Sequence, residues 1–185
     1  SDLGWNGSAG HAVVALRKVD GAPASYEFGL QVDALTPDAG FAKALSGMSD
    51  LPAVIESVTA DVVASLSAPL DRDAGKQQPQ IDGIEVKNVL MVWGPLKLHA
   101  EGAVAPDAQG LAAGRIEIRV TNWQHLVPLM VASGAVKPEL SQTADNMLSA
   151  LAQQSPDKDV LALPLTLEGG WMTLGPFPLG PAPPL

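Results

Sequence analysis

Alternation of apolar and polar residues, repeated along most of the chain, constrains the fold more than any other feature. Residues 96–100 (LKLHA) and 116–120 (IEIRV) each place an apolar side chain at every second position. A period of two is that of a β-strand with one buried face, and it is typical of antiparallel sheets. Further strands are predicted at residues 11–19, 24–35, 54–68, 81–93, 161–167 and 170–176.

Three short helices are expected to interrupt these strands. Thr36 is placed to cap the first helix, with Pro37 at its first position. The second is expected after Asn122 and the third from Pro138, where apolar residues recur at helical spacing. The sequence therefore predicts an α+β fold. We expect a long, curved, mainly antiparallel sheet with about three short helices packed on one side, all within one domain of residues 1–185.

Composition excludes several classes of function. The 185 residues include 11 Lys and Arg against 20 Asp and Glu, so the net charge is −9. An acidic chain lacks the clustered basic surface that nucleic acid requires, so no nucleic-acid partner is expected. The absence of cysteine removes disulfides, thiolate nucleophiles and thiolate metal sites. The longest apolar runs have the length of a strand, well short of the ~20 residues of a membrane-spanning helix.

The sequence contains none of the common catalytic or phosphate-binding motifs. His99 and Glu101 lie two apart on one strand face and could form half of a metal site, but Lys97 marks that face as solvent-facing. We therefore expect no metal, no cofactor and no enzymatic activity. An unrecognised hydrolase is retained as the third alternative, after the two non-enzymatic functions given below.

A short repeat joins two distant parts of the chain. Residues 91–98 and 172–179 share the pattern hydrophobic, Gly, Pro, hydrophobic, any residue, Leu. Two interpretations are open, namely two similar bends in a sheet or a duplicated structural unit. Tryptophans near the repeat also allow two interpretations, since they can anchor the core or line an apolar groove. The candidate ligand-binding residues are Trp93, Leu96, Leu98, Trp123 and Met130.

Several of these motifs together resemble a known family. They are Trp93-Gly94-Pro95-Leu96, Val120-Thr121-Asn122-Trp123 and the ending Leu179-Gly180-Pro181-Ala182-Pro183. The chain resembles the C-terminal half of the domain-of-unknown-function 2125 family of bacterial proteins. The strand and turn pattern is more loosely similar to that of AsmA-like envelope proteins. The resemblance implies a periplasmic location, with the full-length protein anchored to the inner membrane by an N-terminal segment absent here.

Two non-enzymatic functions follow from the resemblance and from the expected apolar sheet face. The first is a periplasmic domain that binds or shields a lipid-like ligand in cell-envelope biogenesis. The second is a structural or protein-interaction domain. Its apolar face would be covered by a missing N-terminal half, an envelope protein partner or a second copy of the chain. Under the first function, an uncovered apolar strip is expected beside Trp93 and Trp123.

Overall fold

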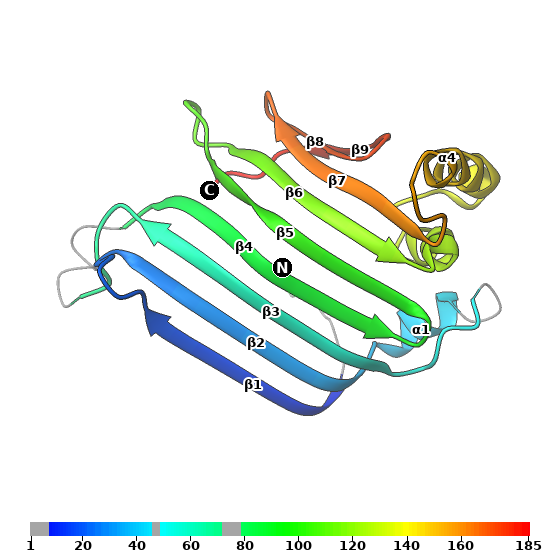
Figure 1. Ribbon diagram of the computed structural model, residues 1–185, viewed down its shortest axis with the longest axis horizontal. Coiled ribbons are helices and arrows are strands. Elements are labelled where there is room, and N and C mark those ends of the chain that lie inside the picture. Colours follow the sequence, from blue (N-terminus) through cyan, green and yellow to red (C-terminus); the bar gives the residue numbers. More distant parts are fainter. Residues whose placement is uncertain (1–7, 46–48, 72–78) are drawn as a thin grey trace.

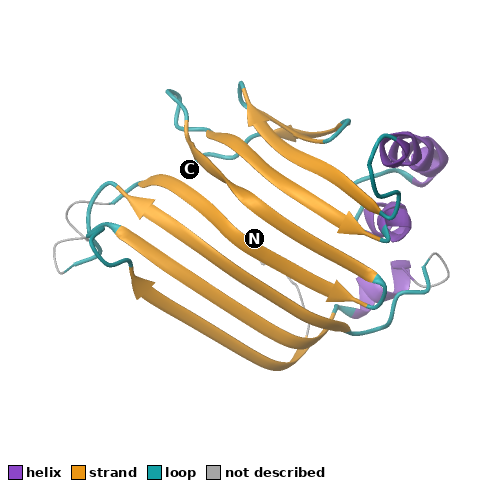
Figure 2. Cartoon of the chain, in the orientation of Figure 1, coloured by secondary structure: helices purple, strands orange, loops and turns teal. Residues whose placement is uncertain are grey.

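The computed structural model describes residues 8–45, 49–71 and 79–185, which form an antiparallel sheet with short helices at one end (Figures 1 and 2). Each strand pairs with the next strand in sequence, from β1 at one edge to β9 at the other. The predicted α+β class is therefore confirmed. The strands are β1 (Ser8–Lys18), β2 (Ser25–Thr36), β3 (Ile55–Leu66), β4 (Ile81–Trp93), β5 (Leu96–Pro106), β6 (Ala112–Thr121), β7 (Val160–Glu168), β8 (Trp171–Leu174) and β9 (Phe177–Pro181).

The strand register gives the sheet one apolar face and one polar face, because cross-strand partners point to the same side. One apolar row across β1 to β4 consists of Leu16, Phe28, Val62 and Val86. Another, across β3 to β7, consists of Val58, Met91, Leu98, Val120 and Leu161. The intervening residues carry the charges, as in the row Arg17, Glu27, Val63 and Glu85. The alternation read from the sequence thus separates the two faces.

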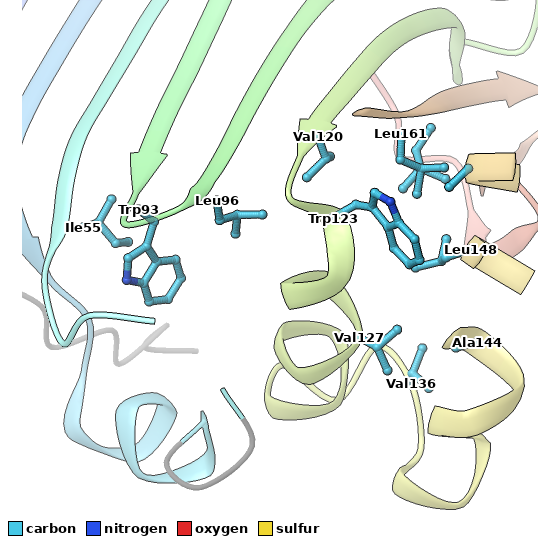
Figure 3. Close-up of a cluster of buried hydrophobic side chains, with 12 residues drawn as sticks. Ile55, Trp93, Leu96, Val120, Trp123, Val127, Val136, Ala144, Leu148 and Leu161 are labelled. Atoms are coloured by element: carbon cyan, nitrogen blue, oxygen red, sulfur yellow. The ribbon is translucent and has the colours of Figure 1, made fainter. Parts of the chain in front are cut away.

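The helices cover the apolar face only at one end of the strands. They are α1 (Ala39–Leu45), α3 (Leu126–Ala132) and α4 (Ser141–Gln153), with single 3₁₀ turns η1 (Trp123–His125) and η2 (Pro138–Leu140). Figure 1 shows these helices at the end of the sheet where β4 turns into β5, with α4 beside the start of β7. Their apolar side chains close a core around Trp93, Val120, Trp123 and Leu148 (Figure 3). The opposite end of the strands carries turns and no described helix.

The first helix begins later than the sequence indicated. Thr36 is the last residue of β2, and α1 starts at Ala39. The Asp38 carboxylate accepts hydrogen bonds from the amides of Gly40 (2.7 Å) and Phe41 (3.1 Å). Asp38 therefore caps this helix, and the prediction of a Thr36 cap is wrong. A carboxylate at this position also interacts favourably with the free amides of the first helical turn.

Both copies of the Gly-Pro repeat form two-residue hairpin turns at the helical end of the sheet. Trp93 pairs with Leu96 across one turn, and Leu174 pairs with Phe177 across the other. Gly94 and Gly175 have φ angles of +57° and +53°. Glycine at the first central position followed by proline is the sequence of a type II′ turn, whose twist matches that of paired strands. The interpretation of the repeat as two similar bends therefore describes the structure.

The proline-rich end of the chain packs against the opposite end of the sheet. After edge strand β9, the carbonyl of Pro183 accepts a hydrogen bond from Ala112 (2.8 Å), and the amide of Leu185 donates to Gly110 (3.1 Å). Ala182 joins Ala112 and Leu167 in a second, smaller core. Proline is tolerated here because an edge strand leaves one side of its backbone unpaired.

Candidate apolar binding groove

An apolar groove of about 420 Å³ lies between the α3–α4 region and the turn that joins β8 to β9. Leu140, Met147 and Leu179 form exposed parts of its walls, with 53%, 38% and 43% of their surface accessible. Val136 and Ala144 are buried and form its deeper part. Such a groove falls within the size range of small-molecule sites, which are concave and mostly apolar. The remaining lining residues are Met130, Ala135, Lys137, Thr143, Pro176, Phe177 and Pro178.

Local hydrogen bonds hold the two walls in place. After α3, the amide of Val136 donates to the carbonyl of Met130 (2.9 Å), which folds the 133–137 segment back along the helix. Pro138 then opens η2, where a residue without an amide hydrogen is well tolerated. On the other wall, the amide of Gly175 donates to the carbonyl of Pro164 (2.8 Å) and ties the β8–β9 turn to β7.

The structure places the five predicted ligand-binding residues in or against one core. Trp93, Leu96 and Trp123 are 4%, 0% and 5% exposed, and Leu98 and Met130 pack against them as half-buried residues. The helices therefore cover the strip beside Trp93 and Trp123, and the expectation that this strip is uncovered is wrong. Met130 is the one member of the five that also lines the groove. Ligand binding by the five residues stays a prediction.

Polar contacts fix the two buried tryptophans. Trp93 Nε1–H donates to the carbonyl of Pro52 (2.7 Å), and Trp123 Nε1–H donates to the carbonyl of Lys158 (2.9 Å). Asn122 directly precedes Trp123, and its φ of +55° is left-handed. Its side-chain Nδ2 donates to the carbonyl of Pro95 (2.7 Å). Asn122 thereby links the β4–β5 turn to the start of the helices, which gives the motif of residues 120–123 a structural role.

Comparison with known families identifies the chain. A family model described as an uncharacterized protein conserved in bacteria (DUF2125) matches residues 1–183. The chain belongs to the DUF2125 family. Searches of curated proteins and of solved structures gave no significant match. The matched range of this DUF2125 chain contains the groove, both Gly-Pro turns and Asn122.

Within the described part of the DUF2125 chain, one arrangement has the residue types of a hydrolytic triad, but its geometry does not suit that chemistry. His125 Nδ1 lies 3.2 Å from Asp50 Oδ1 and 3.5 Å from Ser49 Oγ. A triad needs the carboxylate on one ring nitrogen and the serine on the other, so that the second nitrogen can take the serine proton. Here both oxygens approach the same nitrogen, and the Asp50 side chain is 85% exposed.

Glu101, which the spacing placed on one strand face with His99, is paired with a cation. Glu101 Oε1 accepts a hydrogen bond from Arg119 Nη1 at 3.2 Å, so the carboxylate is held by a cation on the neighbouring strand. Among residues 8–45, 49–71 and 79–185, no group of three or more His, Asp or Glu side chains is arranged to hold a metal ion.

The polar face carries an ion-pair cluster that sequence reasoning missed. Glu27 is 8% exposed and accepts hydrogen bonds from Arg17 Nε and from Lys87 Nζ, the latter at 2.9 Å. These bonds, Arg17 first, lower the pKa of the Glu27 carboxyl from 4.5 to about 2. The three side chains come from β1, β2 and β4, and only the strand register shows that they lie close together. The cluster ties the edge strand to the middle of the sheet.

No helix in the described residues is both long enough and apolar enough to span a membrane.

Proposed function

We propose that this DUF2125 domain is a non-enzymatic module that binds a lipid-like apolar ligand in the groove between α4 and the β8–β9 turn. The observation that supports this is the groove itself, where exposed Leu140, Met147 and Leu179 surround a buried floor of Val136 and Ala144. Large exposed apolar patches are uncommon on soluble monomers and tend to mark binding sites. Flexible methionine side chains at 130 and 147 suit ligands of variable shape.

The free energy of burying methylene groups indicates which acyl-chain lengths can bind. Each buried methylene contributes about 0.8 kcal/mol, and association costs at least about 4 kcal/mol. Full burial of a 12-carbon chain thus contributes about 9 kcal/mol. After the association cost, a net binding free energy of about 5 kcal/mol remains, which corresponds to a Kd of a few tenths of a millimolar. A 16-carbon chain reaches the micromolar range by the same arithmetic. Affinity should rise about fourfold per added methylene until the groove is full.

The test is a titration of the delipidated, folded protein with a fluorescent fatty acid, which is then displaced by saturated carboxylates of 10 to 16 carbons. Leu140→Asp puts a charge into the groove and should weaken binding at least tenfold. Leu70→Asp is the matched control, because Leu70 is 54% exposed against 53% for Leu140 and does not line the groove. Absence of saturable binding, or equal binding by the two variants, would contradict the proposed site.

A second candidate function is a protein-interaction domain, and one observation favours it. β1 is exposed along its entire length, with Val14 at 62% and Leu16 at 66% on the apolar face. An edge strand with unpaired backbone groups can pair with another chain. Sedimentation of the purified domain distinguishes the two functions. The interaction function predicts association that Leu16→Lys abolishes, whereas the ligand-binding function predicts a monomer whose groove binds fatty acids.

The periplasmic, cell-envelope setting is part of the proposal and rests on the family resemblance given above. It is compatible with a chain whose groove would hold a membrane-derived molecule. Fractionation of cells that express the full-length protein tests it. The protein should appear with periplasm-facing membrane proteins and be degraded by protease added to spheroplasts. Protection from that protease would place the domain in the cytoplasm instead.

A further inference from the structure

Among the described residues that line the groove, only one side chain is ionisable, and it is a cation. Lys137 stands between Val136, which is buried, and Pro138 at the start of η2. Of the other described lining residues, Thr143 carries a hydroxyl and the rest have apolar side chains. A binding site with apolar walls and one charged group at a fixed place is suited to an amphiphile, because the charge orients the ligand while the walls bury its chain.

Lys137 differs from several cations of the polar face. Arg17, Lys87 and Arg119 each form a salt bridge with a carboxylate. Lys137 forms no salt bridge within the described part of the chain, although its side chain is exposed and Glu139 lies only two residues away. Glu139 does not line the groove. The ammonium group is therefore available to a ligand that enters beside it.

Building on the proposed function, we infer that the ligand is a single-chain amphiphile with a carboxylate head, that is, a long-chain fatty acid. Its chain lies along Leu140, Met147 and Phe177, and its carboxylate meets Lys137 at the rim. The volume of about 420 Å³ is near the lower end of the range for ligand pockets, so it admits one chain more readily than the two of a phospholipid.

The head is assigned as a carboxylate rather than a phosphate because one lysine offers one positive charge. Phosphate sites use several donors, commonly arginine forks or clustered backbone amides. The lining residues that the structure describes include no arginine. The net charge of −9 repels anions at long range, but at physiological ionic strength charges beyond about 8 Å are largely screened. The carboxylate therefore responds chiefly to Lys137.

The experiment compares four amphiphiles that share a 12-carbon chain: dodecanoate, dodecyldimethylamine N-oxide, dodecyltrimethylammonium and dodecyl phosphate. Each displaces the fluorescent fatty acid below its micelle concentration. We expect dodecanoate to bind about 1.4- to fivefold more tightly than the N-oxide, the range found for exposed ion pairs, and the cation to bind most weakly. In Lys137→Gln, dodecanoate and the N-oxide should bind alike. Lys97→Gln, an exposed lysine on the polar face, should leave the preference unchanged.

The outcomes separate this inference from the proposed function. Equal binding of all heads to the wild-type protein, or a preference that survives Lys137→Gln, overturns the carboxylate assignment and leaves an apolar site in the groove. If dodecyl phosphate binds far more tightly than dodecanoate, the carboxylate assignment is overturned and the head group is a phosphate. Failure of all four to bind, when the circular dichroism spectrum shows a folded protein, overturns both the inference and the proposed function.

Discussion

Replacing Gly94 with alanine tests how the Gly-Pro turn is joined to the core. A Cβ atom at Gly94 would lie 2.6 Å from Pro52 Cδ, and the backbone φ of +57° is one that side-chain-bearing residues rarely adopt. Pro52 cannot move freely, because its carbonyl accepts the hydrogen bond from Trp93 Nε1. The added methyl group therefore strains the backbone and pushes on a residue that anchors a buried tryptophan.

The expected cost has two separable parts. The left-handed backbone costs alanine about 1–2 kcal/mol relative to glycine, reduced by up to about 1 kcal/mol because alanine restricts the unfolded chain. Displacing Pro52 adds about 1 kcal/mol for the weakened hydrogen bond, and more if Trp93 shifts. We expect Gly94→Ala to lower the free energy of unfolding by about 1–3 kcal/mol, summed from these parts.

Gly21→Ala provides the matched control. Gly21 has a φ of +76°, yet no atom of the described residues lies within 4 Å of the position that an added Cβ would occupy, so only the backbone part remains. Urea unfolding followed by far-UV circular dichroism gives both free energies. Gly94→Ala should cost at least about 1 kcal/mol more than Gly21→Ala, the size of the hydrogen-bond contribution. Equal costs for the two variants would refute the contact between the turn and Pro52 as a source of stability.

Two further substitutions test the ion pairs of Glu27 and the contacts of Asn122. Because the pKa of Glu27 is lowered to about 2, its ion pairs stabilise the fold above the usual carboxyl pKa of 4.5 and that contribution is lost as the pH falls from 4.5 towards 2. The urea midpoint of the wild type should therefore fall more steeply over this range than that of Glu27→Gln, and parallel curves would contradict this. Asn122→Gly should lower the free energy of unfolding by about 1 kcal/mol, because it removes the hydrogen bond to Pro95. Asn122→Ala should lower it by about 1 kcal/mol more, because alanine is strained in the left-handed backbone of this position. Urea unfolding measures both values, and equal losses would show that the backbone makes no contribution.

Strand positions and the two faces of the sheet were predictable because a period of two is a local signal. The register then follows from it, since a slip by one residue would put Glu27 among the apolar side chains and Phe28 among the charges. The first helix cap was harder to predict. Thr36 and Asp38 are both acceptable caps in sequence, and the choice depends on how far β2 continues beside β3.

The groove was not predictable in full, because its walls come from residues 130–147 and 176–179, which only the tertiary fold brings together. One signal was present in the sequence. The apolar stripe of α4 includes Ala144 and Leu148, which are buried, and also Met147, which is exposed towards the groove. A stripe wider than one buried face indicates a second contact surface. The sequence also could not show that the helices cover the strip beside Trp93 and Trp123, because this depends on where along the strands the helices dock.

The proposed ligand site is tested most directly by a crystal structure of the domain with a fatty acid that carries bromine at the end of its chain. The anomalous signal of bromine locates the chain without any assumption about the site. We expect one bromine peak in the groove, between α4 and the β8–β9 turn, with the carboxylate near Lys137. A bromine peak over the exposed apolar face of β1 to β3, or no peak in crystals soaked to saturation, would contradict it.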